Sequence, residues 1–241
     1  KDVHFVGIGG VRLSALAEML VRGGSTVSGS DRASSVFTER LGTIGVSIRI
    51  GHDADHIGKA DTVVFTPAVE PDNPELVAAR DRGIRIVEGK KLLGEMTHGK
   101  RLVAVSGTHG KTTTTAMISS ICETAGLDPT AFVGGAVQGP ESNLRVGDSD
   151  VWVVEADEYD RAFLELSPTV AVVTLLESDH LDLYDSESNL VETFDAFLSG
   201  LTEDGSAVIS SDYPASRSLT VPAGRARVDV GFGEDAVLTA E

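Results

Sequence analysis

The chain has 241 residues, 41% of them hydrophobic, and its charged side chains give a net charge of −17 at pH 7. This length accommodates two ordinary domains, and the negative charge disfavours nucleic acid, whose phosphates would be repelled. The sequence predicts no membrane span, because its longest apolar run is far shorter than the roughly 20 residues that a helical span needs. The single cysteine excludes an internal disulfide framework and fits a cytoplasmic location.

The first part of the chain alternates short apolar runs with helical patterns. The predicted strands cover residues 3–8, 26–31, 46–50, 62–66 and 84–87. Alternating strands and helices build a parallel sheet with helices on its faces. We therefore expect a Rossmann-like α/β domain over residues 1–99, which ends where the apolar pattern breaks.

A second α/β series follows. The predicted strands cover residues 102–106, 151–155, 170–175 and 207–210, and the predicted helices cover 111–124 and 188–201. The tail, residues 223–241, has the pattern of short strands without a closing helix. We expect a second, incomplete domain over residues 100–241.

Three glycines, Gly7, Gly9 and Gly10, lie between the first predicted strand and a helix. At such a turn glycines let backbone N–H groups approach a diphosphate. Asp31 stands where a ribose-binding acid would end the second strand. Arg12 replaces the third glycine of a dinucleotide fingerprint, which disfavours an NAD-dependent oxidoreductase. A nucleotide diphosphate without nicotinamide is favoured over a turn that binds nothing.

A phosphate loop is predicted at residues 106–113, Ser-Gly-Thr-His-Gly-Lys-Thr-Thr, between a strand and a helix. The usual spacing would place a glycine at Val105, so the loop is a variant. Its glycines let the backbone curl around phosphate oxygens, Lys111 can reach the β- and γ-phosphates, and the Thr112 hydroxyl can bind Mg²⁺. The predicted ATP-binding residues are Gly107, Thr108, His109, Gly110, Lys111, Thr112 and Thr113.

Acidic clusters follow two later strands. One begins at Glu155, and the other surrounds His180. Ligands of α/β proteins bind at the carboxyl ends of parallel strands, and Mg²⁺ prefers oxygen ligands. Two such clusters behind a phosphate loop favour a functional role over a solvated loop. By contrast, His52 and His56 share helical spacing but lack partner ligands in the sequence, so a metal site there is disfavoured.

The sequence Gly-Thr-His-Gly-Lys-Thr resembles the ATP loop of the Mur ligases, and the segments 4–10, 28–31 and 66–69 are similar to the opening and the UDP-binding loops of that family. The resemblance implies a Rossmann-like domain followed by an incomplete P-loop NTPase-like central domain, with His52 near the uridine. The implied substrate-binding residues are Gly7, Gly9, Gly10, Asp31, Thr66, Pro67 and Ala68. The implied Mg²⁺ ligands are Thr112, Glu155 and His180, and the implied catalytic residues are Lys111 and His180. If Thr112 and Glu155 share one ion, their oxygens should lie within about 5 Å of each other.

The histidine in the loop is similar to that of the alanine-adding branch of the family. This resemblance implies a cytoplasmic enzyme of peptidoglycan precursor synthesis, which joins L-alanine to the lactyl carboxylate of UDP-N-acetylmuramate through an acyl phosphate, with ATP as co-substrate and Mg²⁺ as cofactor. Members carry a third domain that helps to bind the amino acid, so we expect the chain to be a fragment that is inactive alone.

Two alternatives remain. A murein tripeptide-recycling ligase shares the histidine-bearing loop, but it is disfavoured because residues 162–168 continue without the insertion expected of that branch. A non-catalytic nucleotide-binding module is the other.

Overall fold

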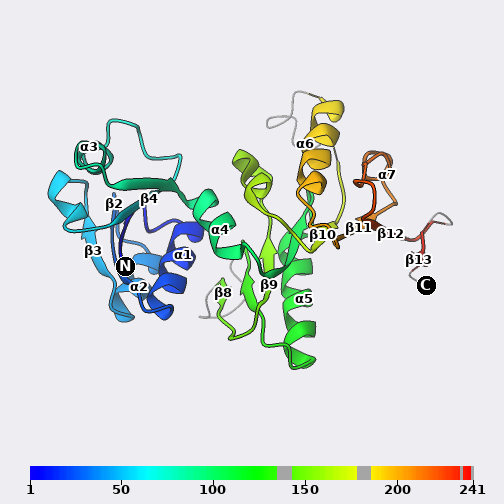
Figure 1. The fold of residues 1–241 in the computed structure, drawn as a ribbon, viewed down its shortest axis with the longest axis horizontal. Coiled ribbons are helices and arrows are strands. Elements are labelled where there is room, and N and C mark those ends of the chain that lie inside the picture. The colour runs from blue at the N-terminus through cyan, green and yellow to red at the C-terminus, as the bar shows by residue number, and fades with distance from the viewer. Residues whose placement is uncertain (135–142, 178–185, 234–235, 240–241) are drawn as a thin grey trace. The chain divides into compact units, whose positions relative to one another are not determined.

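The computed structural model describes residues 1–134, 143–177, 186–233 and 236–239, and its internal contacts divide the chain into two compact units, Lys1–Leu93 and Gly94–Glu241 (Figure 1). The division falls within helix α4 (Gly89–Thr97). The apolar pattern placed the boundary after residue 99, just beyond the end of this helix. None of the described helices is long and apolar enough to cross a membrane.

Unit 1 is a five-stranded parallel sheet in the order β3-β2-β1-β4-β5. The predicted alternation of strands and helices is confirmed. The elements of this unit that precede α4 are β1 (Asp2–Val6), α1 (Val11–Arg22), β2 (Thr26–Asp31), α2 (Val36–Thr43), β3 (Ser47–Ile50), η1 (Ala54–Ile57), β4 (Thr62–Phe65), α3 (Pro74–Asp81) and β5 (Arg85–Glu88).

The apolar residues of these elements meet between the sheet and its helices. One cluster joins Val6 and Val63 of the sheet to Ile57 of η1 and Leu76 of α3, all at most 1% exposed. Complete burial of a side chain of this size stabilises the fold by roughly 1.5–3 kcal/mol. The cluster therefore holds η1 and α3 against the sheet, and these elements carry part of the candidate site.

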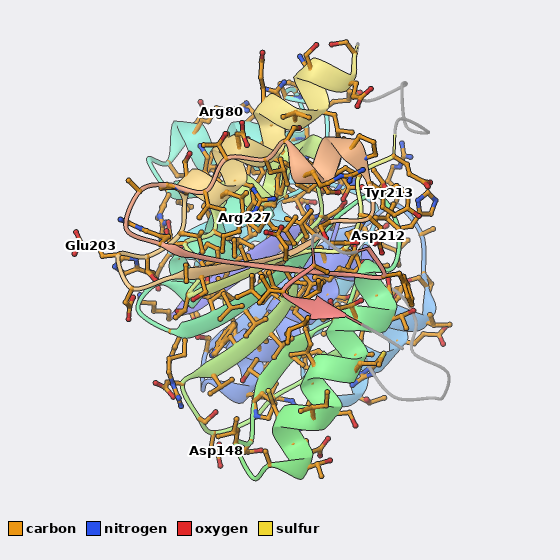
Figure 2. The ribbon with its side chains drawn as sticks, turned by 90° about the vertical axis from the view of Figure 1, so that its right-hand side faces the viewer. Arg80, Asp148, Glu203, Asp212, Tyr213 and Arg227 are labelled. Atoms are coloured by element: carbon orange, nitrogen blue, oxygen red, sulfur yellow. The ribbon has the colours of Figure 1, made fainter. Side chains whose placement is uncertain are left out.

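Unit 2 is an eight-stranded sheet in the order β13-β12-β11-β10-β6-β9-β7-β8, in which only the β7–β8 pair is antiparallel among the described strands. Figure 2 shows α5 on one side of the strands, with α6 and α7 on the other. The elements are β6 (Arg101–Ser106), α5 (Lys111–Thr124), β7 (Thr130–Phe132), β8 (Leu144–Arg145), β9 (Val151–Glu155), η2 (Tyr159–Glu165), β10 (Val170–Val173), α6 (Glu187–Ser199), β11 (Ser206–Ser210), α7 (Pro214–Arg217), β12 (Ala226–Gly231) and β13 (Leu238–Thr239).

Strand β10 is shorter than the predicted strand over residues 170–175. It ends at Val173, because the next residues turn toward the loop after β6: the carbonyl of Leu175 accepts a hydrogen bond from Thr108 N at 2.9 Å.

Three phenylalanines of η2 and α6 form an apolar contact in unit 2. The Phe163 ring stacks on Phe197, with centroids 4.9 Å apart, and meets Phe194 edge to face. This contact fastens η2 to α6.

Candidate functional site

The glycine loop of unit 1 packs tightly at the carboxyl ends of β1, β2 and β4. Gly7 N donates to Ser30 O at 2.9 Å, and Gly9 N donates to Asp31 Oδ2 at 2.8 Å. Gly7 has a φ of +83°, and a Cβ at this position would lie 2.8 Å from Thr66 Cγ2. Only glycine fits this turn without strain. The fold thus brings Gly7, Gly9, Asp31 and Thr66 together.

The remaining residues expected around this loop lie next to it in the chain. Gly10 is the N-cap of α1, where no side chain caps the helix and no acid occupies the first turn. The positive end of a helix dipole favours an anion at such a position. Pro67 and Ala68 form a turn that is closed by a hydrogen bond from Val69 N to Thr66 O at 2.9 Å.

A buried carboxylate, Glu75 at the start of α3, lies beside the same loop. Its side chain is 0% exposed. His4 Nε2 lies 3.0 Å from Oε2, and Ser30 Oγ donates to the same oxygen at 2.6 Å. Oε1 faces His52 Nδ1 at 3.1 Å and His56 Nδ1 at 3.3 Å. The two histidines that lacked a partner in the sequence therefore share one carboxylate.

Hydrogen bonds determine the charge state of Glu75. Burial alone would raise its pKa, but the hydrogen bonds from His4 and Ser30 outweigh burial and lower the pKa from 4.5 to about 2. The carboxylate is therefore ionised across the physiological range. Because Ser30 also accepts the Gly7 amide through its carbonyl, Glu75 helps to fix the position of the glycine loop.

In unit 2 the predicted phosphate loop connects β6 to α5. Gly107 and Gly110 have φ values of +136° and +81°, in the region that favours glycine. A Cβ at Gly107 would lie 2.9 Å from the carbonyl oxygen of Leu175. The two glycines are thus required by the turn, and α5 begins directly after Gly110.

Polar contacts fasten this loop to the chain that follows β10. Thr108 Oγ1 accepts a hydrogen bond from Glu177 N at 3.1 Å, and Thr174 Oγ1 donates to the His109 carbonyl at 2.6 Å. The His109 ring itself is about half exposed and lies 4.0 Å from Glu177. The first amides of α5 have no acceptor within the helix. The loop therefore holds a helix N-terminus in a defined position.

Lys111 points back into the loop. Its Nζ donates to the Gly107 carbonyl at 2.7 Å and to Glu158 Oε1 at 2.9 Å. The lysine side chain is 15% exposed and that of Glu158 is 6% exposed. The lysine predicted to bind phosphate is thus paired with a buried carboxylate three residues after Glu155.

Thr112 and Glu155 form the second polar pair. Thr112 Oγ1 donates to Glu155 Oε1 at 3.0 Å, within the expected 5 Å, so the predicted proximity is confirmed. Gly134 N donates to the other oxygen of Glu155 at 2.7 Å. Two ligands at right angles around Mg²⁺, each at roughly 2.1 Å, lie about 3.0 Å apart. The two oxygens, which here share a hydrogen bond, therefore lie close enough together for one ion to contact both.

The third predicted metal ligand, His180, lies outside the described residues. Within the described part of the chain, no group of three or more His, Cys, Asp or Glu side chains is arranged to hold a metal. Thr113 is exposed one residue beyond the pair. The metal role of Thr112, Glu155 and His180 therefore stays a prediction, supported by the spacing of the first two.

Sequence reasoning missed Glu75, Gly134 and Thr174 as contributors to these sites. From the sequence, Glu75 could be recognised only as an acid at the start of a helix, after Asn73 and Pro74. Its histidine partners are distant in sequence. Gly134 and Thr174 contribute a backbone amide and a hydroxyl. No pattern of residue types identifies such contacts, because they depend on which strands become neighbours.

In the mostly parallel sheet of unit 2, β6 leads through a glycine-rich turn into α5, and carboxylates lie at the end of the neighbouring strand β9 and just after it. This arrangement defines unit 2 as an α/β unit with a glycine-rich loop that is predicted to bind phosphate. The Mur ligase family catalytic domain matches residues 2–101, and the Mur ligase middle domain matches residues 105–239. The chain belongs to the Mur ligase family.

Named relatives agree with this assignment. The chain is 44% identical, over all 241 residues, to UDP-N-acetylmuramate–L-alanine ligase of Methylibium petroleiphilum and spans 51% of that protein. The solved UDP-N-acetylmuramate–alanine ligase of Thermotoga maritima aligns with a TM-score of 0.83 and 32% identity, over 95% of this chain and 52% of that one. The UDP-N-acetylmuramate:L-alanyl-gamma-D-glutamyl-meso-diaminopimelate ligase of Neisseria meningitides aligns with a TM-score of 0.84 and 25% identity, over 95% and 78%. The chain thus spans about half the length of the curated relatives it matches.

Proposed function

We propose that the chain is the nucleotide- and UDP-sugar-binding part of a cytoplasmic, ATP-dependent ligase that joins L-alanine to UDP-N-acetylmuramate. The observation that carries the proposal is the arrangement at the start of α5, where Thr112 faces a carboxylate at the end of β9 and Lys111 faces a carboxylate just after it. Identity of 44% along the whole chain to a ligase of that name supports the choice of substrates.

The proposed reaction brings one anion against another. The lactyl carboxylate of the sugar attacks the γ-phosphate of ATP and expels ADP, which gives an acyl phosphate. The amine of L-alanine then attacks the acyl carbon and expels phosphate. Lys111 and the first amides of α5 would neutralise charge on the transferred group, which lowers the barrier.

The residues at the start of α5 fit a divalent cation. Thr112 and Glu155 would hold Mg²⁺ with the oxygens that lie 3.0 Å apart, and His180 is proposed as a further ligand. When bound, the ion would supply positive charge next to the phosphates. Glu155 is kept in place by the amide of Gly134, so its carboxylate is oriented before the ion arrives.

Unit 1 is proposed to bind the UDP part of the substrate. The amides at the start of α1, after Gly10, would face the diphosphate, and Gly7, Gly9, Asp31 and Thr66 would shape the pocket. Pro67 and Ala68 would complete its wall, with residues 1–99 as the domain. This loop holds Asp31 against the Gly9 amide, so one carboxylate oxygen is already oriented by the protein.

A tripeptide-recycling ligase is the second candidate. The solved tripeptide ligase aligns as well as the alanine ligase does, so the fold alone does not separate them. The higher sequence identity to alanine ligases favours L-alanine. The absence of an insertion in residues 162–168 also favours an alanine ligase over a tripeptide ligase.

The test uses the full-length parent protein with UDP-N-acetylmuramate and ATP, and measures ADP release with L-alanine or with the tripeptide. Release that depends on L-alanine is expected. Lys111→Ala should lower turnover by roughly two to three orders of magnitude, while the affinity for the UDP-sugar changes less than about two-fold, because that site lies in unit 1. Release that depends on the tripeptide, or near-normal turnover of Lys111→Ala, would contradict the proposal.

A further inference from the structure

The amine of Lys111 lies among three protein oxygens, two of them at close hydrogen-bond distance. Nζ lies 2.7 Å from the Gly107 carbonyl, 3.5 Å from the Thr108 carbonyl and 2.9 Å from Glu158 Oε1. An ammonium group has three donors. A phosphate oxygen that approaches this amine therefore competes with these oxygens for its hydrogens.

Of the three partners, Glu158 should bind the amine most strongly, because it alone carries a charge. Its side chain is 6% exposed, and Oε2 is buried without a hydrogen-bond partner among the described residues. An unsatisfied buried oxygen destabilises a fold, and more so in a charged group. The ion pair with Lys111 thus leaves one oxygen of Glu158 without a partner among the described residues.

The neighbouring carboxylate has separate partners. Glu155 binds the Thr112 hydroxyl through one oxygen and the Gly134 amide through the other. Glu158 lies three residues later and contacts Lys111 instead. The acid at the end of β9 and the acid three residues later thus contact different residues at the start of α5. One faces the proposed ion, and the other faces the proposed phosphate-binding cation.

We propose that Glu158 is a positioning residue that holds the Lys111 amine against the loop until nucleotide phosphates arrive, and that phosphate binding is an exchange of one anion for another. This inference rests on the proposed role of residues 106–113 as a phosphate loop. The carboxylate keeps the lysine folded into the loop rather than extended into solvent. It also opposes the bound phosphates, both by competing for the amine and by its own negative charge, and so weakens the hold on ADP after the reaction.

The experiment measures the binding of ATP to the full-length parent protein by calorimetry, with Mg²⁺ and with a chelator. Glu158→Gln keeps the shape of the side chain and removes its charge, so it should bind ATP about ten-fold more tightly in both conditions. Glu165→Gln is the matched control, because this exposed glutamate ends η2, the segment that begins directly after Glu158. Its affinity should equal that of the wild type.

A double variant tests whether the gain acts through the lysine. Lys111→Met with Glu158→Gln leaves neither charge buried alone, and should bind ATP at least about ten-fold more weakly than Glu158→Gln. If the double variant binds as tightly as Glu158→Gln, the gain does not come from the freed amine and the inference is overturned.

The other outcomes separate the inference from the proposed function. Weaker binding by Glu158→Gln in both conditions would mean a structural role, and weaker binding only with Mg²⁺ would mean a metal ligand; either result overturns the exchange. Equal affinities of Glu158→Gln and the wild type would overturn the exchange but leave the phosphate loop intact. If no variant binds ATP, wild type included, both the exchange and the phosphate loop are overturned.

Discussion

Lowering the pH should destabilise the fold of unit 1, because it protonates the buried carboxylate of Glu75. Glu75 has a pKa of about 2 in the folded chain against an ordinary 4.5, because hydrogen bonds from His4 and Ser30 outweigh the effect of burial. A group whose pKa is lowered by folding stabilises the fold above its unfolded pKa, and that stabilisation is lost as the pH falls through its folded pKa. The relevant window therefore runs from about pH 5 down to about pH 2.

The size of the effect follows from the two pKa values. A pKa lowered from 4.5 to about 2 corresponds to about 3 kcal/mol of stability at neutral pH. About 1.4 kcal/mol of this is lost by pH 3.5, and most of the rest by pH 2. This is a large fraction of the 5–15 kcal/mol that typically separates folded from unfolded domains.

The most direct assay is carbon-13 NMR of the glutamate carboxyls, with Glu75 assigned as the resonance that disappears in Glu75→Gln. At pH 3.5 an ordinary glutamate is about nine-tenths protonated, whereas Glu75 should still have the chemical shift of a carboxylate. Urea unfolding followed by circular dichroism between pH 6 and pH 3.5 measures the accompanying loss of stability.

The single tryptophan separates the two units in the unfolding experiment. Trp152 lies in β9 of unit 2, so its fluorescence follows that unit while circular dichroism follows both. A Glu75 resonance that titrates near pH 4.5 would refute the reasoning, because the histidines and Ser30 would then not hold the carboxylate in its ionised form.

Two further predictions concern unit 2. Gly107→Ala should lower the free energy of unfolding by roughly 1–3 kcal/mol and impair ATP binding, because its φ is +136° and its Cβ would crowd Leu175. The control is Gly126→Ala, whose φ is +74° and whose Cβ would have nothing within 4 Å. In the same urea titration it should lose only about 1 kcal/mol. Equal losses would show that crowding at the loop is unimportant. Glu155→Gln in the full-length protein should lower activity steeply, and part of the loss should be recovered at high Mg²⁺ by mass action. A loss that does not respond to Mg²⁺ would argue against Glu155 as a metal ligand.

Local pattern was sufficient to predict most of the fold. Helix α5 begins and ends at the predicted residues, Lys111 and Thr124, because a glycine turn precedes it and the helical pattern stops at Gly126. Strand β9 also matches its prediction, since a run of four apolar residues before Glu155 favours a buried strand. Short elements such as η2 and β8 were missed, because neither has a periodic pattern long enough to recognise.

The glycine turn before α5 and the place of Glu155 at the end of a strand could likewise be predicted from the sequence. Glycine, lysine and threonine at fixed spacing between a strand and a helix have a local physical meaning, and an acid directly after a strand lies at the ligand-binding edge of a parallel sheet. These inferences need only the order of neighbouring elements along the chain.

Only the tertiary structure decided which polar groups meet. Glu158 and Lys111 are 47 residues apart, and Glu75 is 71 residues from His4, so no local pattern links them. Such partners are selected when strands become neighbours in a sheet and helices pack on its faces, and burial then makes each pairing strong enough to fix the charge or position of a side chain. The sequence determined the two glycine-rich loops, whereas the packing of distant elements determined that Lys111 is held by a carboxylate and that three histidines share Glu75.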